Sequence, residues 1–318
     1  MRIALLPNVQ SRAFREDRKL IDELWRTAQG KGTLLETHGV SDLPEALMDA
    51  REFGADTIVI AGGDGTVSQV TTALLRTWPR ESLPQLYVLH CGTMNTISKS
   101  TGNRGTPNEQ LQALVSGGTM GKTRRWPIQV GESRWGWLFG AGLIASFIEE
   151  YERGPEPTSP KKAARTLASA VAAALTGGEL HDRLFERVSA EVLVDGHTWP
   201  IRDWLLLSAG GMHDLGLGFR PHMAVLDHPE HFHMLGVGST AARFAGDLLR
   251  IRMGRLPRRS LMFDAPAREV RLTATKPIRY NLDGELEVGT SKLTLRCGPP
   301  ITFLLPPNAK PPSNKLGP

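Results

Sequence analysis

Residues 60–66 read IAGGDGT, in which three glycines surround one aspartate directly after the β-branched run TIVI at 57–60. Glycine lets the backbone approach another group without a Cβ in the way. A helix N-terminus offers unpaired N–H groups and a partial positive charge, which suits a phosphate. The order of strand, glycine loop and helix therefore predicts a phosphate-binding loop, with Thr66 as the N-cap of the helix.

Asp64 makes this prediction more specific, because a carboxylate repels a neighbouring phosphate unless a cation lies between them. Mg²⁺ accepts such hard oxygen ligands, so we expect Asp64 to contact Mg²⁺ directly or through water. The alternative is an ordinary strand-to-helix turn in which the glycines serve geometry and Asp64 is solvated. The loop lacks the spacing of the dinucleotide fingerprint and of a Walker loop.

The first third of the chain alternates strand and helix patterns around this loop. Apolar or β-branched runs indicate strands at 2–8, 33–38, 57–63 and 86–90. Amphipathic stretches indicate helices at 14–29, 43–52, 66–78 and 107–118. This alternation predicts an α/β domain with a mostly parallel sheet and right-handed crossovers.

After residue 125 the pattern changes to short strands joined by turn signals. Such segments occupy 128–143, 190–211, 269–289 and 291–305, and two helical stretches interrupt them at 160–178 and 239–255. This texture is typical of an antiparallel sandwich or barrel. We therefore expect an α/β domain over 1–125, a β-rich domain over 126–305 whose last strand could return to the first domain, and a disordered proline-rich tail over 306–318.

Composition restricts the class of protein but not its partner. Of the 318 residues, 40% are hydrophobic and 22% charged, the net charge is +5, and there are only two cysteines. No run approaches the ~18 apolar residues of a spanning helix, and the apolar run at the N-terminus is too short for a signal peptide. We expect a cytoplasmic protein that associates peripherally with a membrane. No zinc-finger or interleaved aromatic and basic pattern indicates nucleic acid.

Two further motifs accompany the glycine loop. Gly92, Thr93 and Asn95 follow the strand at 86–90, and ligands of open α/β sheets bind outside the carboxyl ends of strands. Asp283-Gly284-Glu285 lies far away in the β-rich region. By itself this tripeptide is the signal of a hairpin turn.

Taken in this order and spacing, GGDGT, GTMN and DGE resemble the diacylglycerol kinase and sphingosine kinase family of lipid kinases. The resemblance implies a phosphofructokinase- and NAD-kinase-like α/β domain, a C-terminal antiparallel β-sandwich, and an ATP site in the cleft between them. It implies that ATP and Mg²⁺ are the cofactors and that a membrane lipid at an anionic surface is the substrate. It leaves homodimerisation open.

The resemblance also implies roles for individual residues. Asp283 would be the general base that takes the proton of the lipid hydroxyl, and Glu285 would help to place Mg²⁺ or the base. Asp64 would act with them at the metal. ATP would be held by the first loop and the two glycine loops, through Asn8, Ser11, Gly62, Gly63, Asp64, Gly65, Thr66, Gly92, Thr93 and Asn95.

The chain departs from the family pattern at several positions. Val9 replaces a proline of the first loop, Thr96 replaces an aspartate after the GTxN asparagine, and Ile144 replaces the aspartate of a glycine-containing segment. These departures leave the lipid acceptor undetermined: diacylglycerol-, sphingoid- and ceramide-like lipids all stay open. An NAD-kinase-like small-molecule kinase and a nucleotide- or lipid-binding relative without turnover are the alternatives.

Two other segments carry functional hypotheses. Five histidines fall between 213 and 233, and we expect a solvated loop or one near the lipid acceptor, with metal binding as the alternative. The stretch 241–259 combines six arginines with an apolar stripe formed by Phe244, Leu248 and Ile251. It is either a basic amphipathic helix on an anionic membrane or a surface helix whose stripe packs on the sandwich.

Overall fold

The computed structural model describes residues 1–28, 30–228, 230–257, 261–307 and 309. Its contacts divide the chain into two compact units, the first containing Met1–Arg125 and the described residues after 298, the second Trp126–Gly298. Part of the predicted tail, residues 308 and 310–318, lies outside the described residues. Each unit has a hydrophobic core of its own.

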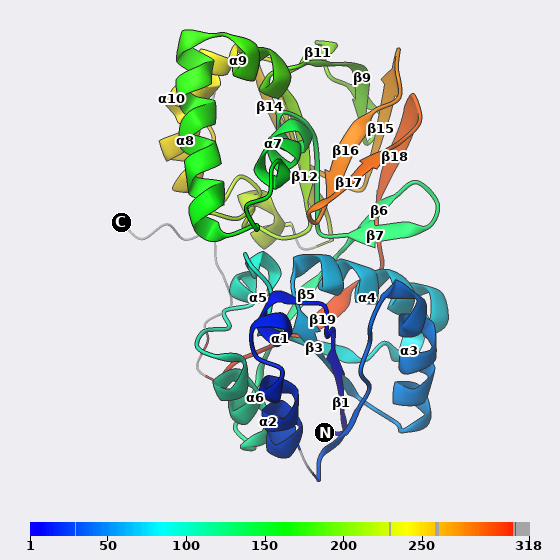
Figure 1. The fold of residues 1–318 in the computed structure, drawn as a ribbon. Coiled ribbons are helices and arrows are strands. Elements are labelled where there is room, and N and C mark those ends of the chain that lie inside the picture. Colours follow the sequence, from blue (N-terminus) through cyan, green and yellow to red (C-terminus); the bar gives the residue numbers. More distant parts are fainter. Residues whose placement is uncertain (29, 229, 258–260, 308, 310–318) are drawn as a thin grey trace. The chain divides into compact units, whose positions relative to one another are not determined.

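The first unit is built on a six-stranded sheet (Figure 1). Its strands follow the order β2 (Gly32–Leu34), β1 (Ile3–Pro7), β3 (Thr57–Gly62), β4 (Gln85–His90), β19 (Ile301–Leu305) and β5 (Gly121–Arg125). All neighbours are parallel except β5, which runs antiparallel to β19. The last strand of the chain thus belongs to the sheet of the first unit.

Helices cover both faces of this sheet, which explains why β1 and β3 are continuous apolar runs buried along their whole length. On one face α1 (Arg12–Glu16), α2 (Lys19–Ala28) and α6 (Pro107–Val115) pack Phe14, Leu24 and Leu111 against the strands. α3 (Leu43–Glu52) and α4 (Asp64–Thr77) pack together on the other side, and α5 (Thr96–Ser100) follows β4 (Figure 1). The single helix expected over 14–29 is wrong, because the chain breaks at the extended Asp17 between α1 and α2.

The second unit contains two antiparallel sheets. One has the order β10 (His197–Thr198), β9 (Val188–Val194), β15 (Glu269–Ala274), β18 (Lys292–Cys297), β6 (Ile128–Val130) and β7 (Arg134–Gly136), with β11 (Asp203–Trp204) also paired to β9. The other has the order β14 (Met262–Ala267), β13 (Phe232–Val237), β12 (Leu206–Gly210), β8 (Leu138–Gly142), β16 (Arg279–Leu282) and β17 (Glu285–Val288).

Alternate residues of both sheets form one core, as in a β-sandwich. Val192, Leu272 and Leu295 of the first sheet pack with Leu207 and Met234 of the second. A second apolar cluster joins the outer side of β12 and β13 to four helices: α7 (Leu143–Glu152), α8 (Pro160–Thr176), α9 (Glu179–Leu184) and α10 (Ala241–Arg252). The predicted class, an α/β domain with a mostly parallel sheet and an antiparallel sandwich domain, is confirmed.

Candidate active site

The predicted nucleotide-binding residues of the first unit come from three loops at one edge of its sheet. Asn8 follows β1, the GGDGT segment begins at the end of β3, and Gly92 follows β4. Pro7 pairs with Ala61 and Gly62 pairs with His90, so the carboxyl ends of the three strands are in register. The structure therefore brings together residues that are far apart in the sequence.

Asp64 connects two of these loops through its carboxylate. One oxygen accepts a hydrogen bond from the backbone N–H of Thr96 at 3.0 Å, and the other accepts from Ile97 at 2.9 Å. Both donors belong to the first turn of α5, whose N–H groups have no partner within the helix. Burial raises the pKa of the Asp64 carboxyl, and the N–H groups of Ile97 and Thr96 oppose that shift. Asp64 is therefore a half-buried carboxylate with two backbone partners rather than one that contacts only water.

The glycines allow the two loops to touch. A Cβ added at Gly92 would lie 2.3 Å from the Cα of Gly63, and one at Gly62 would lie 2.5 Å from the Cβ of Thr66. Gly63 has an ordinary φ of −89°, so close approach rather than a left-handed backbone explains its residue type. The GGDGT and GTMN segments thus form one packed unit of backbone.

Two asparagines complete the connections around the loops. Asn8 donates its Nδ2–H to the Oγ1 of Thr66 at 2.9 Å. Asn95 adopts a left-handed φ of 52°, accepts the N–H of Gly92 at 2.8 Å and donates to its carbonyl at 3.0 Å. Ser11 Oγ is buried without a hydrogen-bond partner among the described residues. A buried hydroxyl that lacks a partner has hydrogen-bonding capacity left for a ligand.

The predicted N-cap at Thr66 is wrong. Helix α4 begins at Asp64 with Gly63 in the cap position, and Thr66 lies in its first turn. Gly63 caps the helix without a side-chain hydrogen bond, and the Asp64 carboxylate accepts backbone N–H groups of α5. The hydroxyl of Thr66 receives Asn8 instead of capping α4.

In the second unit, Asp283 and Gly284 form the two-residue turn between β16 and β17. Their φ values are 50° and 99°, and Leu282 pairs with Glu285, as in a type I′ hairpin. The carboxylate of Asp283, a residue only 7% exposed, accepts the backbone N–H groups of Trp137 and Leu138, both at 2.8 Å. The hairpin interpretation is confirmed, and the predicted base also fastens this hairpin to the β7–β8 segment.

Glu285 lies beside a basic residue that the sequence motifs did not reveal. Arg134 of β7 donates to Glu285 at 2.8 Å and forms an ion pair with Glu287 at 2.7 Å. Tyr280 also donates its hydroxyl hydrogen to Glu287, at 2.8 Å. No sequence motif identifies Arg134, because it meets the carboxylates of Glu285 and Glu287 only in the folded hairpin.

Three of the five histidines, His213, His222 and His233, are buried, so of the two kinds of loop expected here the solvated one is wrong for them. The Nε2 atom of His222 lies 3.0 Å from the Oγ of Ser208, and the centroids of the His222 and His233 rings are 5.7 Å apart. His213 is also buried. Burial, followed by the charges of His233 and His213, holds the pKa of His222 well below its ordinary value. Among the described residues, no three His, Cys, Asp or Glu side chains are arranged to hold a metal ion.

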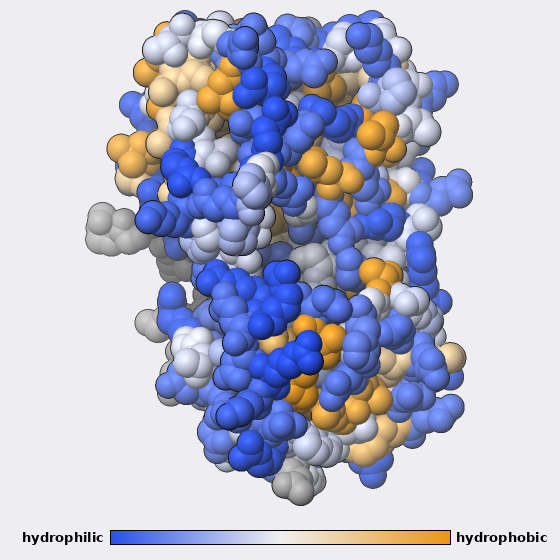
Figure 2. All heavy atoms as spheres, viewed as in Figure 1, coloured by the Kyte–Doolittle hydropathy of each residue, from blue (hydrophilic) through white to orange (hydrophobic). Residues whose placement is uncertain are grey.

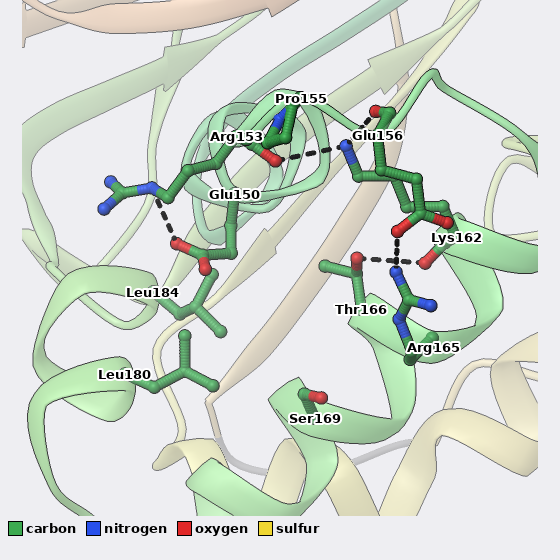
Figure 3. A pocket seen from close by; sticks show the side chains of 11 residues that line it. Glu150, Arg153, Pro155, Glu156, Lys162, Arg165, Thr166, Ser169, Leu180 and Leu184 are labelled. Carbon is green, nitrogen blue, oxygen red and sulfur yellow. Dashed lines mark hydrogen bonds and ion pairs between the residues drawn. The ribbon is translucent and has the colours of Figure 1, made fainter.

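A pocket of about 330 Å³ opens in the second unit beside α7, α8 and α9 (Figure 3). Its charged side chains are engaged with one another: Arg153 pairs with Glu150 at 3.3 Å, and Arg165 pairs with Glu156. Lys162 donates to the carbonyls of Arg153 and Glu156 at 3.1 and 2.7 Å. None of the predicted site residues lines this pocket.

Comparison with known proteins agrees with the motifs in the first unit. Residues 2–122 match the model of the diacylglycerol kinase catalytic domain. Lipid kinase YegS of Escherichia coli (strain K12) is 33% identical over 76 residues, which is 24% of this chain and 25% of that protein. A probable lipid kinase YegS of Shigella boydii serotype 18 is 32% identical over the same length. The match spans about a quarter of the length of these relatives, and the family model ends before Asp283.

Solved structures extend the likeness to the fold of the whole chain. A putative diacylglycerol kinase from Bacillus anthracis str. Sterne has a TM-score of 0.74 at 17% identity and covers 97% of this chain and 98% of its own. A diacylglycerol kinase structure from the same organism has a TM-score of 0.67 at 16% identity, covering 96% of this chain and 97% of its own. The predicted resemblance is therefore confirmed: residues 2–122 are similar to the diacylglycerol kinase catalytic domain, and the chain has the fold of these proteins.

Proposed function

We propose that the chain is an ATP-dependent lipid kinase that transfers the γ-phosphate to a hydroxyl of a diacylglycerol-, sphingoid- or ceramide-like lipid. The observation that carries this proposal is the joined pair of loops formed by GGDGT and GTMN, within the segment that matches the diacylglycerol kinase catalytic domain. These loops present backbone at the start of α4, where unpaired N–H groups favour an anion. Asn8, Ser11 and Thr66 border the same loops.

The contacts of Asp64 fit a Mg²⁺ ion that binds together with the nucleotide, rather than an ion held by protein ligands alone. Both oxygens of Asp64 already accept backbone N–H groups, so contact through a bound water requires less rearrangement than direct ligation. Mg²⁺ usually keeps several waters and is bound through one or two carboxylates plus substrate phosphates. Asp64 in the first unit, and Glu285 in the second, are the proposed carboxylates. When bound, the ion would neutralise charge on the phosphates.

Asp283 is the proposed general base. One oxygen of its carboxylate accepts the backbone N–H of Trp137 and the other accepts that of Leu138, and an ionised carboxylate is an acceptor with about four lone-pair sites, as a group that receives the proton of a hydroxyl must be. The two N–H donors hold the carboxylate in a single orientation, and positioning is most of what phosphoryl transfer requires of a protein. Arg134 would hold Glu285 beside it.

The proposal is tested by incubating the purified chain with labelled ATP and Mg²⁺ and a panel of diacylglycerol, sphingosine, ceramide and NAD in detergent micelles. Phosphorylation of a lipid supports it and names the acceptor class. Labelling of NAD alone would instead establish the small-molecule kinase. Binding of ATP with no transfer to any acceptor would establish a relative without turnover.

A further inference from the structure

Helix α10 has two distinct apolar faces. The stripe recognised in the sequence is used for packing: Phe244 and Ile251 are buried in the cluster under the helices, and Leu248 packs partly against it. Asp247, which is also buried, lies on this same side. The stripe therefore does not serve as a contact surface for a membrane.

The opposite face of α10 is exposed and contains no polar side chain along its centre. At about 100° per residue, Ala242, Gly246, Leu249 and Met253 lie along one line, roughly opposite Phe244 and Ile251. Leu249 is 69% exposed and Met253 is 47% exposed, and the two lie one turn apart on this line. A Cβ added at Gly246 would meet no heavy atom within 4 Å, so this line is open.

Arginines flank this apolar line on both sides. Arg252 lies on one side, and Arg243 and Arg250 lie on the other, with Arg255 just beyond the helix. All four are exposed, and none forms an ion pair with another residue in the part of the chain that the structure describes. The only acidic residue of the helix, Asp247, is turned to the interior. The exposed face is thus apolar along its centre and cationic at its margins.

Helix α8 packs beside α10 and also exposes apolar residues. Its exposed residues include Ala164, Ala168, Ala172 and Leu175, the last of these 67% exposed. The helix has no acidic residue, and of its three basic residues Lys161 is exposed, Arg165 is paired with Glu156 and Lys162 is buried. Hydrophobic side chains accordingly gather at the edge of the second unit formed by the two helices (Figure 2).

We infer that the exposed face of α10, extended by α8, docks on an anionic lipid bilayer. A helix with an apolar centre and arginines at its margins suits the membrane interface, where aliphatic side chains enter the acyl boundary and guanidinium groups meet anionic headgroups. The positive margins distinguish this occupant from a neutral apolar partner. The inference rests on the proposed function in one respect, since docking would bring the chain to a lipid acceptor.

The test is co-sedimentation with phosphatidylcholine vesicles that contain or lack phosphatidylglycerol, with no ATP present. The unaltered chain should bind the anionic vesicles more tightly, and the difference should shrink as ionic strength rises from ~0.1 to ~1 M, where the Debye length falls from about 10 to about 3 Å. Replacing both Arg243 and Arg250 by glutamine should weaken anionic binding about 25-fold, or about fivefold for each charge removed. Equal binding to both kinds of vesicle would refute the electrostatic part.

The contribution of the apolar residues to vesicle binding is tested with one variant that should weaken binding and one that should strengthen it. The double variant Leu249→Gln/Met253→Gln should weaken binding to the anionic vesicles by at least tenfold. Gly246→Leu should strengthen it, because its side chain enters open space on the same line. Met48→Gln on α3 is the matched control, since Met48 is 52% exposed and lies in the other unit. If the double variant behaved like this control, the inference would be wrong.

Two further readouts separate this inference from its competitors. Transfer to a soluble short-chain diacylglycerol should be the same in the face variants and the unaltered chain, whereas transfer to diacylglycerol in anionic vesicles should fall. Sedimentation velocity addresses a second copy of the chain as the occupant. Face variants that turned a dimer into a monomer and left vesicle binding intact would overturn the inference, whether or not the chain proves to be a kinase.

Discussion

Replacing Asp283 by asparagine removes one of the two acceptors that fasten the β16–β17 hairpin to β7 and β8. The aspartate oxygens lie 2.8 Å from the N–H groups of Trp137 and Leu138, in a residue that is 7% exposed. Asparagine tolerates the left-handed φ of 50°, so the backbone of the turn should persist. The substitution therefore tests the carboxylate rather than the turn.

The expected loss follows from these contacts. Hydrogen bonds to a charged group are worth about 1.5–3 kcal/mol, and a buried N–H left without an acceptor costs about 1–3 kcal/mol. The asparagine side chain would keep one acceptor oxygen and present an NH₂ group to the other donor. We expect Asp283→Asn to lower the free energy of unfolding by about 3 kcal/mol, since about one charged bond is lost and the other is weakened.

The chain supplies a matched control in Asp195. Asp195 and Gly196 form the two-residue turn between β9 and β10, with φ values of 43° and 86°. The Asp195 carboxylate accepts the N–H groups of Arg268 at 3.1 Å and Glu269 at 2.7 Å, but this turn is exposed. Asp195→Asn should cost about 1 kcal/mol or less, because water can replace the lost acceptor.

Urea unfolding followed by tryptophan fluorescence measures this difference, since Trp126, Trp135, Trp137, Trp199 and Trp204 all lie in the second unit. Equal unfolding free energies for Asp283→Asn and the unaltered chain would refute the fastening role of the carboxylate. Lipid phosphorylation by the same samples, measured where each is fully folded, tests the base. Near-normal turnover of Asp283→Asn would refute that role, while Asp195→Asn should keep full turnover.

Three further predictions follow from the contacts around the loops and the histidines. Arg134→Met should lower transfer about tenfold by releasing Glu285, and Arg134→Lys should restore part of it; unchanged turnover in the micelle assay would contradict this. Gly92→Ala should lower the free energy of unfolding of the first unit by about 3 kcal/mol in urea, because the new Cβ would lie 2.3 Å from the Cα of Gly63 in the GGDGT loop. A decrease below about 1 kcal/mol would mean that the GGDGT and GTMN loops can separate freely. Because the pKa of His222 is lowered in the folded chain, the unfolded chain binds a proton at His222 at a higher pH than the folded chain does. The stability that neutral His222 contributes is complete above about pH 6.5 and is lost below it by up to about 1.4 kcal/mol per pH unit. His222→Gln should flatten this dependence in unfolding measurements from neutral to mildly acidic pH, and an unchanged slope would exclude His222 as its origin.

Periodicity was sufficient to predict the class of both units. Strands of the first unit are buried on both faces and read as continuous apolar runs, while helices between them keep their amphipathic spacing. In the second unit, turn residues such as Asp283-Gly284 marked the hairpins. These signals are local, so the sequence carries them directly.

Element ends and helix faces were less predictable. Thr66 was misplaced as an N-cap because α4 begins two residues earlier, at Asp64, and the Thr66 hydroxyl accepts a hydrogen bond from Asn8, 58 residues away in the sequence. The stripe on α10 was visible in the sequence, but only burial shows that Phe244 packs inside and that Leu249 is exposed on the other side. A helical period does not specify which of two apolar faces meets the core.

The sequence by itself determined the motifs and the resemblance, because GGDGT, GTMN and DGE are short runs whose chemistry is legible from residue type. Only the tertiary structure decided what their side chains do. It places the carboxylates of Asp64 and Asp283 each on two consecutive backbone N–H groups, and it brings Arg134 to Glu285. The physical reason is that buried N–H groups need acceptors, and which carboxylate supplies them depends on contacts between segments 32 to 146 residues apart.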